Sequence, residues 1–243
     1  MLRSVSPLAA LALVLAAASC KSDKSTGPSS SGFAGSYSGI IAGATTSGTL
    51  TITIPSASPA SPARSPIAVE PSVDGVVVLT GALKLPGGIP PFAISGSFDN
   101  AAGQLVGVTA GPFIITGGFS GGKFTGGWTN TGTGATGGFS LLPVTSGSSA
   151  LLLCGVFTGP SNGVWNLSIV GSSMVGVAAS PSSTLRLNGT FDAAKNTMNN
   201  ITSPDDATVT ASGALTVATN TAVGIWAAGP AKGTWSGSAA ACN

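Results

Sequence analysis

Short stretches of the chain alternate apolar and polar side chains. Residues 48–54 alternate aliphatic and hydroxyl groups, and residues 164–169 and 184–191 repeat this pattern. Alternation with a period of two is typical of a strand with one face in a core and the other in solvent. Turn-forming residues separate such stretches, as in 99–103 and 160–163. Because no segment after residue 20 shows the 3.6-residue apolar period of an amphipathic helix, the pattern predicts an all-β fold.

Three short motifs occur twice in the same order, which indicates an internal duplication. The matched segments are Tyr37-Ser38-Gly39 with Phe157-Thr158-Gly159, residues 95–99 with 188–192, and Gly127-Trp128 then Gly138-Phe139-Ser140 with Ile225-Trp226 then Thr234-Trp235-Ser236. Each unit holds about eight short strands at the spacing typical of an antiparallel meander. Eight strands can close into a small barrel, and closure removes exposed strand edges. We therefore expect two tandem eight-stranded β-barrels, with one continuous sheet or sandwich as the alternative.

The expected organisation has five segments. They are a signal peptide (1–19), a tether that begins at Cys20 (20–32), a first barrel-like unit (33–143), a linker (144–153) and a second barrel-like unit (154–243). Residues 55–72, rich in proline and serine, interrupt the first unit only. A segment of this composition packs no core. It is either an inserted loop without a further role or a barrel-mouth loop that contacts a partner.

The N-terminus carries the features of an export signal. Arg3 supplies a positive charge, residues 8–18 are an unbroken run of Leu, Ala and Val, and small residues precede Cys20. The apolar run is too short to span a bilayer, which needs about 20 residues. Ala17-Ala18-Ser19-Cys20 resembles the lipobox of bacterial lipoproteins, although most lipoboxes carry Leu at the position of Ala17.

This resemblance implies that Cys20 is acylated and becomes the first residue of the mature chain. The protein would then be exported to the cell envelope and held on a membrane by its lipid. Lys21, the residue after the cysteine, would favour the outer membrane. An ordinary secretory signal with an incidental cysteine is the alternative.

Charged residues are scarce, at 7% of 243 residues with a formal net charge of +2. Such a surface has a weak electrostatic field, so we expect no nucleic acid as a partner. The chain contains no histidine, which excludes Ser-His-Asp and Cys-His catalytic groups and His-ligated metals. The sequence therefore predicts a protein that is not an enzyme and that binds no cofactor and no metal.

The few carboxylates fall in turns and loops. Glu70, the only glutamate, lies in the proline-rich segment. Asp99 and Asp192 occupy equivalent turns, where a carboxylate commonly accepts hydrogen bonds from its own backbone; a role as calcium ligand is the alternative. Asp205 and Asp206 are expected in a solvated turn. A glycosidase pair would need two carboxylates within about 5–10 Å of each other, and their spacing does not require this.

If Cys20 is acylated, two cysteines remain that could form a disulfide. They are Cys154 at the start of the second unit and Cys242 at its end. A barrel brings its first and last strands side by side, and an exported protein meets oxidising conditions. We expect a disulfide that holds the second barrel closed. Loop-closure entropy gives it roughly 4–5 kcal/mol of stabilisation. A reactive or metal-binding pair has no support, because no histidine accompanies it.

Four tryptophans are the candidates for lining a ligand site, with packing of the barrel interior as the alternative. They are Trp128, Trp165, Trp226 and Trp235. Their glycine-rich surroundings, as in Gly233-Thr234-Trp235, loosely resemble the small barrels of lipocalin-like, avidin-like and transferrin-binding lipoproteins. In lipocalins the Gly-x-Trp signature lies near the start of the barrel rather than near its end, so the resemblance implies an architecture and no binding residues.

Three functions remain open on the sequence. The first is a lipid-anchored binding module for an unknown ligand or protein partner. The second is a structural envelope lipoprotein without a small-molecule site, which a solidly packed interior would favour over a cavity above about 300 Å³. The third is an outer-membrane pore, whose strands would be longer and flanked by aromatic girdles.

Overall fold

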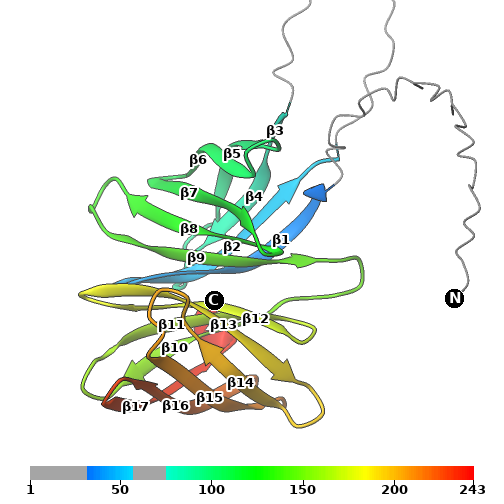
Figure 1. Cartoon of the computed structure of the whole chain (residues 1–243). Helices are drawn as coiled ribbons and strands as arrows, with labels where there is room; N and C mark the ends of the chain where they lie inside the picture. The colour runs from blue at the N-terminus through cyan, green and yellow to red at the C-terminus, as the bar shows by residue number, and fades with distance from the viewer. Residues whose placement is uncertain (1–31, 57–74) are drawn as a thin grey trace, which may run out of the picture.

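The computed structural model describes residues 32–56 and 75–243, and these form two antiparallel β-barrels in tandem (Figure 1). Within both ranges the chain is almost entirely strand, so the all-β prediction is confirmed. Each barrel is a meander in which nearly every strand pairs with its neighbours in sequence.

The first barrel contains nine strands that occupy eight positions around the wall. They are β1 (Gly35–Gly43), β2 (Thr46–Ile54), β3 (Val76–Val78), β4 (Thr80–Lys84), β5 (Phe92–Asp99), β6 (Gln104–Ala110), β7 (Phe113–Ser120), β8 (Lys123–Asn130) and β9 (Thr136–Val144). Pairing of β1 with β9 and of β5 with β6 closes the ring. Strands β3 and β4 share one position, because β3 pairs with the second half of β5 and β4 with its first half.

The second barrel contains eight strands. They are β10 (Leu151–Thr158), β11 (Gly163–Val170), β12 (Ser173–Ser180), β13 (Ser183–Asp192), β14 (Thr197–Thr202), β15 (Val209–Thr216), β16 (Thr221–Ala228) and β17 (Ala231–Ser238). The first and last strands pair antiparallel, with Cys154 opposite Ser238. Two closed rings rule out the alternative of one continuous sheet.

The junction between the barrels is shorter than the linker expected at residues 144–153. Strand β9 runs to Val144 and β10 already begins at Leu151. The leucines at 151–153 belong to the second barrel because they alternate between its interior and its outer face. Leu153 lies in the interior core, whereas Leu152 packs against the contact between the barrels.

The duplication is real, but one of its three motif matches is displaced. A Cβ atom on Gly39 would lie 2.0 Å from the carbonyl oxygen of Ser140, and one on Gly155 would lie 2.1 Å from that of Ser236. These two glycines therefore occupy the same place in their barrels. Tyr37-Ser38-Gly39 is consequently offset by four residues from Phe157-Thr158-Gly159, because short aromatic-glycine motifs recur along β strands of this composition.

The other two matches align in register. Strand β5 turns into β6 after Asp99 just as β13 turns into β14 after Asp192. Trp128 pairs with Gly137 as Trp226 pairs with Gly233. Strand for strand, β8 and β9 of the first barrel therefore correspond to β16 and β17 of the second.

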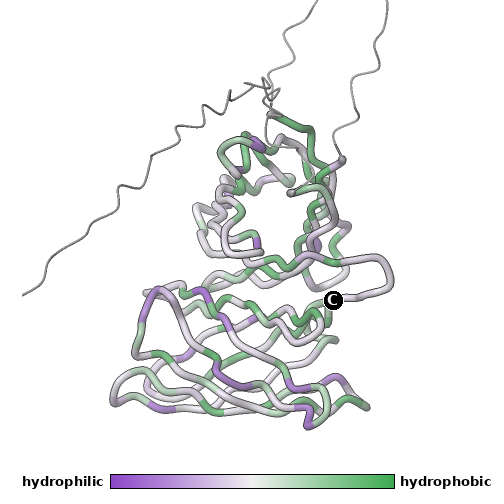
Figure 2. The backbone as a smooth tube through the Cα atoms, turned by 45° about the vertical axis from the view of Figure 1, so that its right-hand side comes forward, coloured by the Kyte–Doolittle hydropathy of each residue, from purple (hydrophilic) through white to green (hydrophobic). Residues whose placement is uncertain are grey.

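The barrels lie against each other through β1 and β9 on one side and β11 and β12 on the other (Figure 1). Both barrels alternate more and less hydrophobic residues along their strands, and Figure 2 shows the first barrel as a closed ring above the second. At the contact the outward side chains are also apolar and buried. They are Ile40 and Ala42 of the first barrel and Val177 and Ala179 of the second. Burial of outward residues joins the barrels into one unit.

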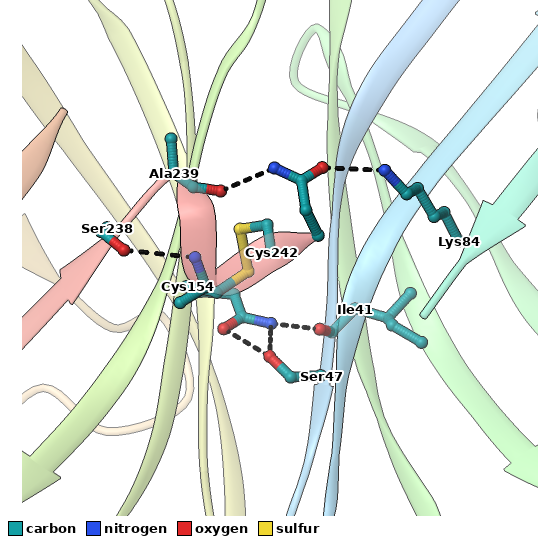
Figure 3. Close-up of a disulfide and its surroundings, with 10 residues drawn as sticks. Ile41, Ser47, Lys84, Cys154, Ser238, Ala239 and Cys242 are labelled. Carbon is teal, nitrogen blue, oxygen red and sulfur yellow. Dashed lines mark hydrogen bonds between the residues drawn. A yellow bond between two sulfur atoms is a disulfide. The ribbon is translucent and has the colours of Figure 1, made fainter. Parts of the chain in front are cut away.

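A buried amide fixes the register of this contact. The side chain of Asn166 is fully buried, and its amide nitrogen donates to the carbonyl oxygen of Ile41 at 2.5 Å and to Ser47 Oγ at 2.6 Å (Figure 3). Two serine hydroxyls also donate across the contact, Ser168 to the carbonyl of Ser38 and Ser140 to that of Gly176. A sliding of the barrels would leave these buried groups unpaired, at about 1–3 kcal/mol each.

Candidate functional site

One end of the second barrel opens into a cavity of about 220 Å³. Connections β10–β11, β12–β13, β14–β15 and β16–β17 lie at this end. The wall is made of inward-facing apolar residues: Phe157, Trp165, Leu167, Ala178, Leu185, Leu187, Ile201, Val209, Ala211, Trp226, Ala228 and Trp235. The rim is made of serines: Ser161, Ser180, Ser182 and Ser183. The site is thus an apolar pocket with hydroxyl groups at its mouth.

Three of the four predicted tryptophans come together in this cavity. Trp165, Trp226 and Trp235 line it, whereas Trp128 is buried in the core of the first barrel. The rings of Trp165 and Trp235 meet edge to face with centroids 4.7 Å apart, and Trp226 meets Phe157 in the same way at 5.8 Å. For Trp128 the packing alternative is correct.

Glycines allow the indole rings to lie flat along the wall. A Cβ on Gly224, the cross-strand partner of Trp235, would lie 2.3 Å from that indole, and a Cβ on Gly213 in the next strand would lie 2.2 Å from it. Trp226 lies over Gly233, its cross-strand partner, in the same manner: a Cβ on Gly233 would lie 2.5 Å from that indole. The rings occupy the space that neighbouring side chains would fill, so they do not block the lumen.

The indole N–H groups are all satisfied by the barrel itself. Trp165 Nε1 donates to the carbonyl of Val156 at 3.0 Å, Trp226 Nε1 to that of Thr158 at 3.1 Å, and Trp235 Nε1 to that of Ile225 at 3.1 Å. The wall therefore offers a bound molecule aromatic and aliphatic surface and no free indole donor.

The hydroxyl groups at the mouth are only weakly engaged. Ser180 Oγ lies 3.4 Å from Ser182 Oγ and 3.5 Å from the carbonyl oxygen of Ser183. Ser161, Ser182 and Ser183 are exposed. Such hydroxyls can rotate to donate to or accept from a polar group at the entrance.

No charged side chain is among the residues that line the cavity. The ionised groups of the β14–β15 connection are turned to other partners. Asp205 accepts hydrogen bonds from the backbone N–H and the guanidinium of Arg186, which lowers the pKa of its carboxyl and raises that of the guanidinium. Asp206 accepts from the backbone and hydroxyl of Thr208, which lowers the pKa of Asp206.

The expected solvated turn at Asp205 and Asp206 is thus half correct. Asp206 is half-buried and bonds only within its own turn, whereas Asp205 is exposed and forms an ion pair with Arg186 on the outer face of β13. The alternation of the 184–191 stretch places Arg186 on the wet face. The alternation does not indicate which carboxylate pairs with Arg186, because the partner, Asp205, lies in the β14–β15 connection and its position depends on the conformation of that turn.

Among the described residues of the first barrel, the place that matches this cavity is filled. Its interior residues leave no room for a water molecule at the matching place. Aliphatic and aromatic side chains fill that place, with Phe113 packed edge to face against Trp128 at a centroid distance of 5.4 Å. Nearer the β7–β8 turn, Phe124 packs edge to face against Tyr37, Phe98 and Phe119 at centroid distances of 4.7–5.3 Å. Burial raises the pKa of the Tyr37 hydroxyl, which donates to the carbonyl of Phe33.

The predicted disulfide between Cys154 and Cys242 is confirmed, with a Cα–Cα distance of 5.1 Å (Figure 3). It does not join the two edge strands directly. Cys154 lies on the outer side of β10, and Cys242 lies in a short 3₁₀ turn, η2 (Ala240–Cys242), that follows β17. The disulfide therefore links η2, which follows the last strand β17, to the first strand β10, and so bridges the two strands that close the barrel. Asn243, beyond it, accepts from Lys84 Nζ of the first barrel at 2.8 Å.

The turns at Asp99 and Asp192 match the prediction of backbone capping. Asp99 Oδ1 accepts from the N–H groups of Ala101 and Ala102, and Asp192 Oδ1 from those of Ala194 and Lys195. In the two ranges that the structure describes, no group of three potential metal ligands occurs. Cys20, Glu70 and most of the proline-rich segment lie outside those ranges.

The aliphatic wall and the serine rim were missed by the sequence reasoning, which singled out only the tryptophans. A usable signal was present in the inward positions of β12 and β15, where small residues follow one another: Gly176 and Ala178 in β12, and Ala211 and Gly213 in β15. Its meaning depends on which face of each strand is inward and on which strand is its neighbour. Both require the register.

The comparisons with known proteins are negative: no family model, no curated protein and no solved structure matches the chain. No helix among residues 32–56 and 75–243 has the length and apolar character needed to cross a membrane. Any functional conclusion therefore depends on the geometry of the site.

Proposed function

We propose that this protein is a lipid-anchored, non-catalytic binding module of the bacterial cell envelope that holds a small apolar ligand in its second barrel. The observation that carries the proposal is the apolar cavity of about 220 Å³ between Trp165, Trp226 and Trp235. Apolar cavities of about 150 Å³ stay dry and take up benzene or xenon. A site of this size suits one substituted ring or a short aliphatic chain.

The absence of charge at the wall supports binding over catalysis. A catalytic group needs an acid, a base or a nucleophile within reach of the bound molecule, and the lining residues supply only hydroxyls, rings and aliphatic groups. The chain as a whole contains no histidine. The hydroxyls of the rim have no base beside them to activate them.

A purely structural role is the second candidate, because the first barrel is packed solid and the cavity of the second is smaller than the roughly 300–1,000 Å³ of drug-sized sites. We favour binding, since a structural barrel gains nothing from an open end. A pore is disfavoured by the interior, because pores line a polar lumen with water and both interiors here are apolar.

A matched pair of variants tests binding. Ala211→Ile places a larger side chain in the cavity, whereas Ala214→Ile places it on the exposed outer face of the same strand. Toluene titrated into the full chain should change the fluorescence of the indoles that line the site. The change should disappear in Ala211→Ile and persist in Ala214→Ile. Absence of a toluene response in the unaltered chain would refute the binding proposal.

The anchor is tested separately at Cys20. Replacement of Cys20 by Ala removes the thiol that would be acylated, and the protein should then leave the membrane fraction. A variant chain that still sediments with membranes would show that another part of the molecule holds it there.

A further inference from the structure

We infer that the ligand of the second barrel is an uncharged molecule with an apolar body and a single hydrogen-bonding group, bound with that group at the serine rim. This inference rests on the proposed binding function and adds the chemical class and the orientation of the ligand.

The inner part of the cavity offers no partner to a polar group, so the buried part of the ligand must be apolar. The indole N–H groups of Trp165, Trp226 and Trp235 already donate to backbone carbonyls, and the remaining wall is aliphatic. A hydroxyl or amide placed there would lose its water without a partner, at a cost of about 1–3 kcal/mol. The inner end of the ligand must therefore be hydrocarbon.

The mouth of the cavity, in contrast, can bind a polar group of the ligand. Three of its serines, Ser180, Ser182 and Ser183, come from the β12–β13 hairpin, and Ser161 comes from the β10–β11 connection. These hydroxyls can donate or accept. The contacts of Ser180 Oγ with Ser182 Oγ at 3.4 Å and with the Ser183 carbonyl oxygen at 3.5 Å are long. One polar group on the ligand would find several partners here and none deeper.

An ionised headgroup would find no opposite charge. No cation lines the site, and Arg186, on the outer face of β13, is already paired with Asp205. Asp206 in the β14–β15 connection and Lys232 at the start of β17 lie at the same end of the barrel, but neither lines the cavity. Desolvation of a carboxylate without a partner is strongly unfavourable.

Two probes of nearly equal shape separate these cases. At pH 7 benzyl alcohol is neutral and benzoate is ionised, and both fit a site for one ring. We expect the full chain to bind benzyl alcohol at least about tenfold more tightly than benzoate. The combined variant Ser180→Ala, Ser182→Ala and Ser183→Ala should weaken benzyl alcohol binding by about three- to tenfold, the value of one lost hydrogen bond, and should leave toluene binding unchanged.

The outcomes distinguish the inference from the function beneath it. If benzoate binds as tightly as benzyl alcohol while toluene also binds, the cavity binds ligands but the neutral class is wrong. If the serine variant binds benzyl alcohol as well as the unaltered chain does, the orientation is wrong. If toluene does not bind to the unaltered chain, the proposed binding of an apolar ligand is itself refuted.

Discussion

At matching positions the two barrels carry side chains of different size. Ile115 pairs with Trp128 in the first barrel, and Ala211 pairs with Trp226 in the second. One further matching pair lies on the opposite wall: Leu83 pairs with Leu50, where Ala178 pairs with Trp165. The smaller partner falls in the second barrel in both cases.

The same substitution pattern continues along the neighbouring strands. Phe113 of the first barrel corresponds to Val209 of the second, and Phe92 corresponds to Leu185. Some inward positions are larger in the second barrel: Ile41 corresponds to Phe157, and Leu50 to Trp165, whose indole lies over glycine. One duplicated meander therefore yields a filled barrel and a hollow one through a few inward positions, while strand order and closure stay the same.

The covalent staple also distinguishes the two barrels. Only the second contains cysteines, and the bond closes 88 residues of chain across its β10–β17 pair. Replacement of both Cys154 and Cys242 by Ser should lower the free energy of unfolding by about 4–5 kcal/mol, from the entropy that the open chain regains.

Guanidinium unfolding followed by far-ultraviolet circular dichroism measures this loss. The unaltered protein in the presence of a reductant is the matched control and should show the same loss. A change below about 1 kcal/mol would show that the packing of β10 against β17 closes the barrel without the staple.

Interior truncation should affect the filled barrel more than enlargement affects the hollow one. Ile115→Ala gives the first barrel the residue of the second, and in a filled interior it should cost about 2–5 kcal/mol because a cavity remains. Ala211→Ile makes the reverse exchange into existing space and should cost less than about 1 kcal/mol.

Unfolding free energies of these two variants measure the difference in packing between the barrels. Equal costs for the two exchanges would mean that the barrels are packed alike. A large cost for Ala211→Ile alone would mean that the space in the second barrel is not there in solution.

Much of the fold follows from the sequence, and much of the site does not. Alternation in 48–54, 164–169 and 184–191 falls within strands β2, β11 and β13, and the two cysteines at the ends of the second unit meet. These features are local or depend only on closure. The cavity depends on the size of the residues that pair with Trp226 and Trp165 on the adjacent strands. These cross-strand partners are set by the strand register and cannot be identified from adjacent residues in the sequence.

The contribution of the Arg186–Asp205 pair in the second barrel to acid sensitivity should be the smallest of the effects. The pKa of Asp205 is lowered in the folded protein by Arg186. The pair therefore stabilises the fold above the ordinary carboxyl pKa of about 3.9, and this contribution is lost as the pH falls through the lower pKa of the folded state. The pair is partly exposed, so we expect less than about 1 kcal/mol.

The difference in unfolding free energy between the unaltered protein and Asp205→Asn measures this contribution. It should be present at pH 7 and should shrink towards pH 2. A difference that stays constant over this range would assign the effect of the substitution to hydrogen bonding of the turn and not to charge.

The most direct test of the difference between the barrels is a crystal structure under xenon pressure, since xenon enters dry apolar cavities. We predict a xenon atom in the second barrel between Trp165, Trp226 and Trp235, and none among the aromatic side chains inside the first barrel. Xenon in neither barrel, or in both, would contradict the account of one hollow and one filled barrel.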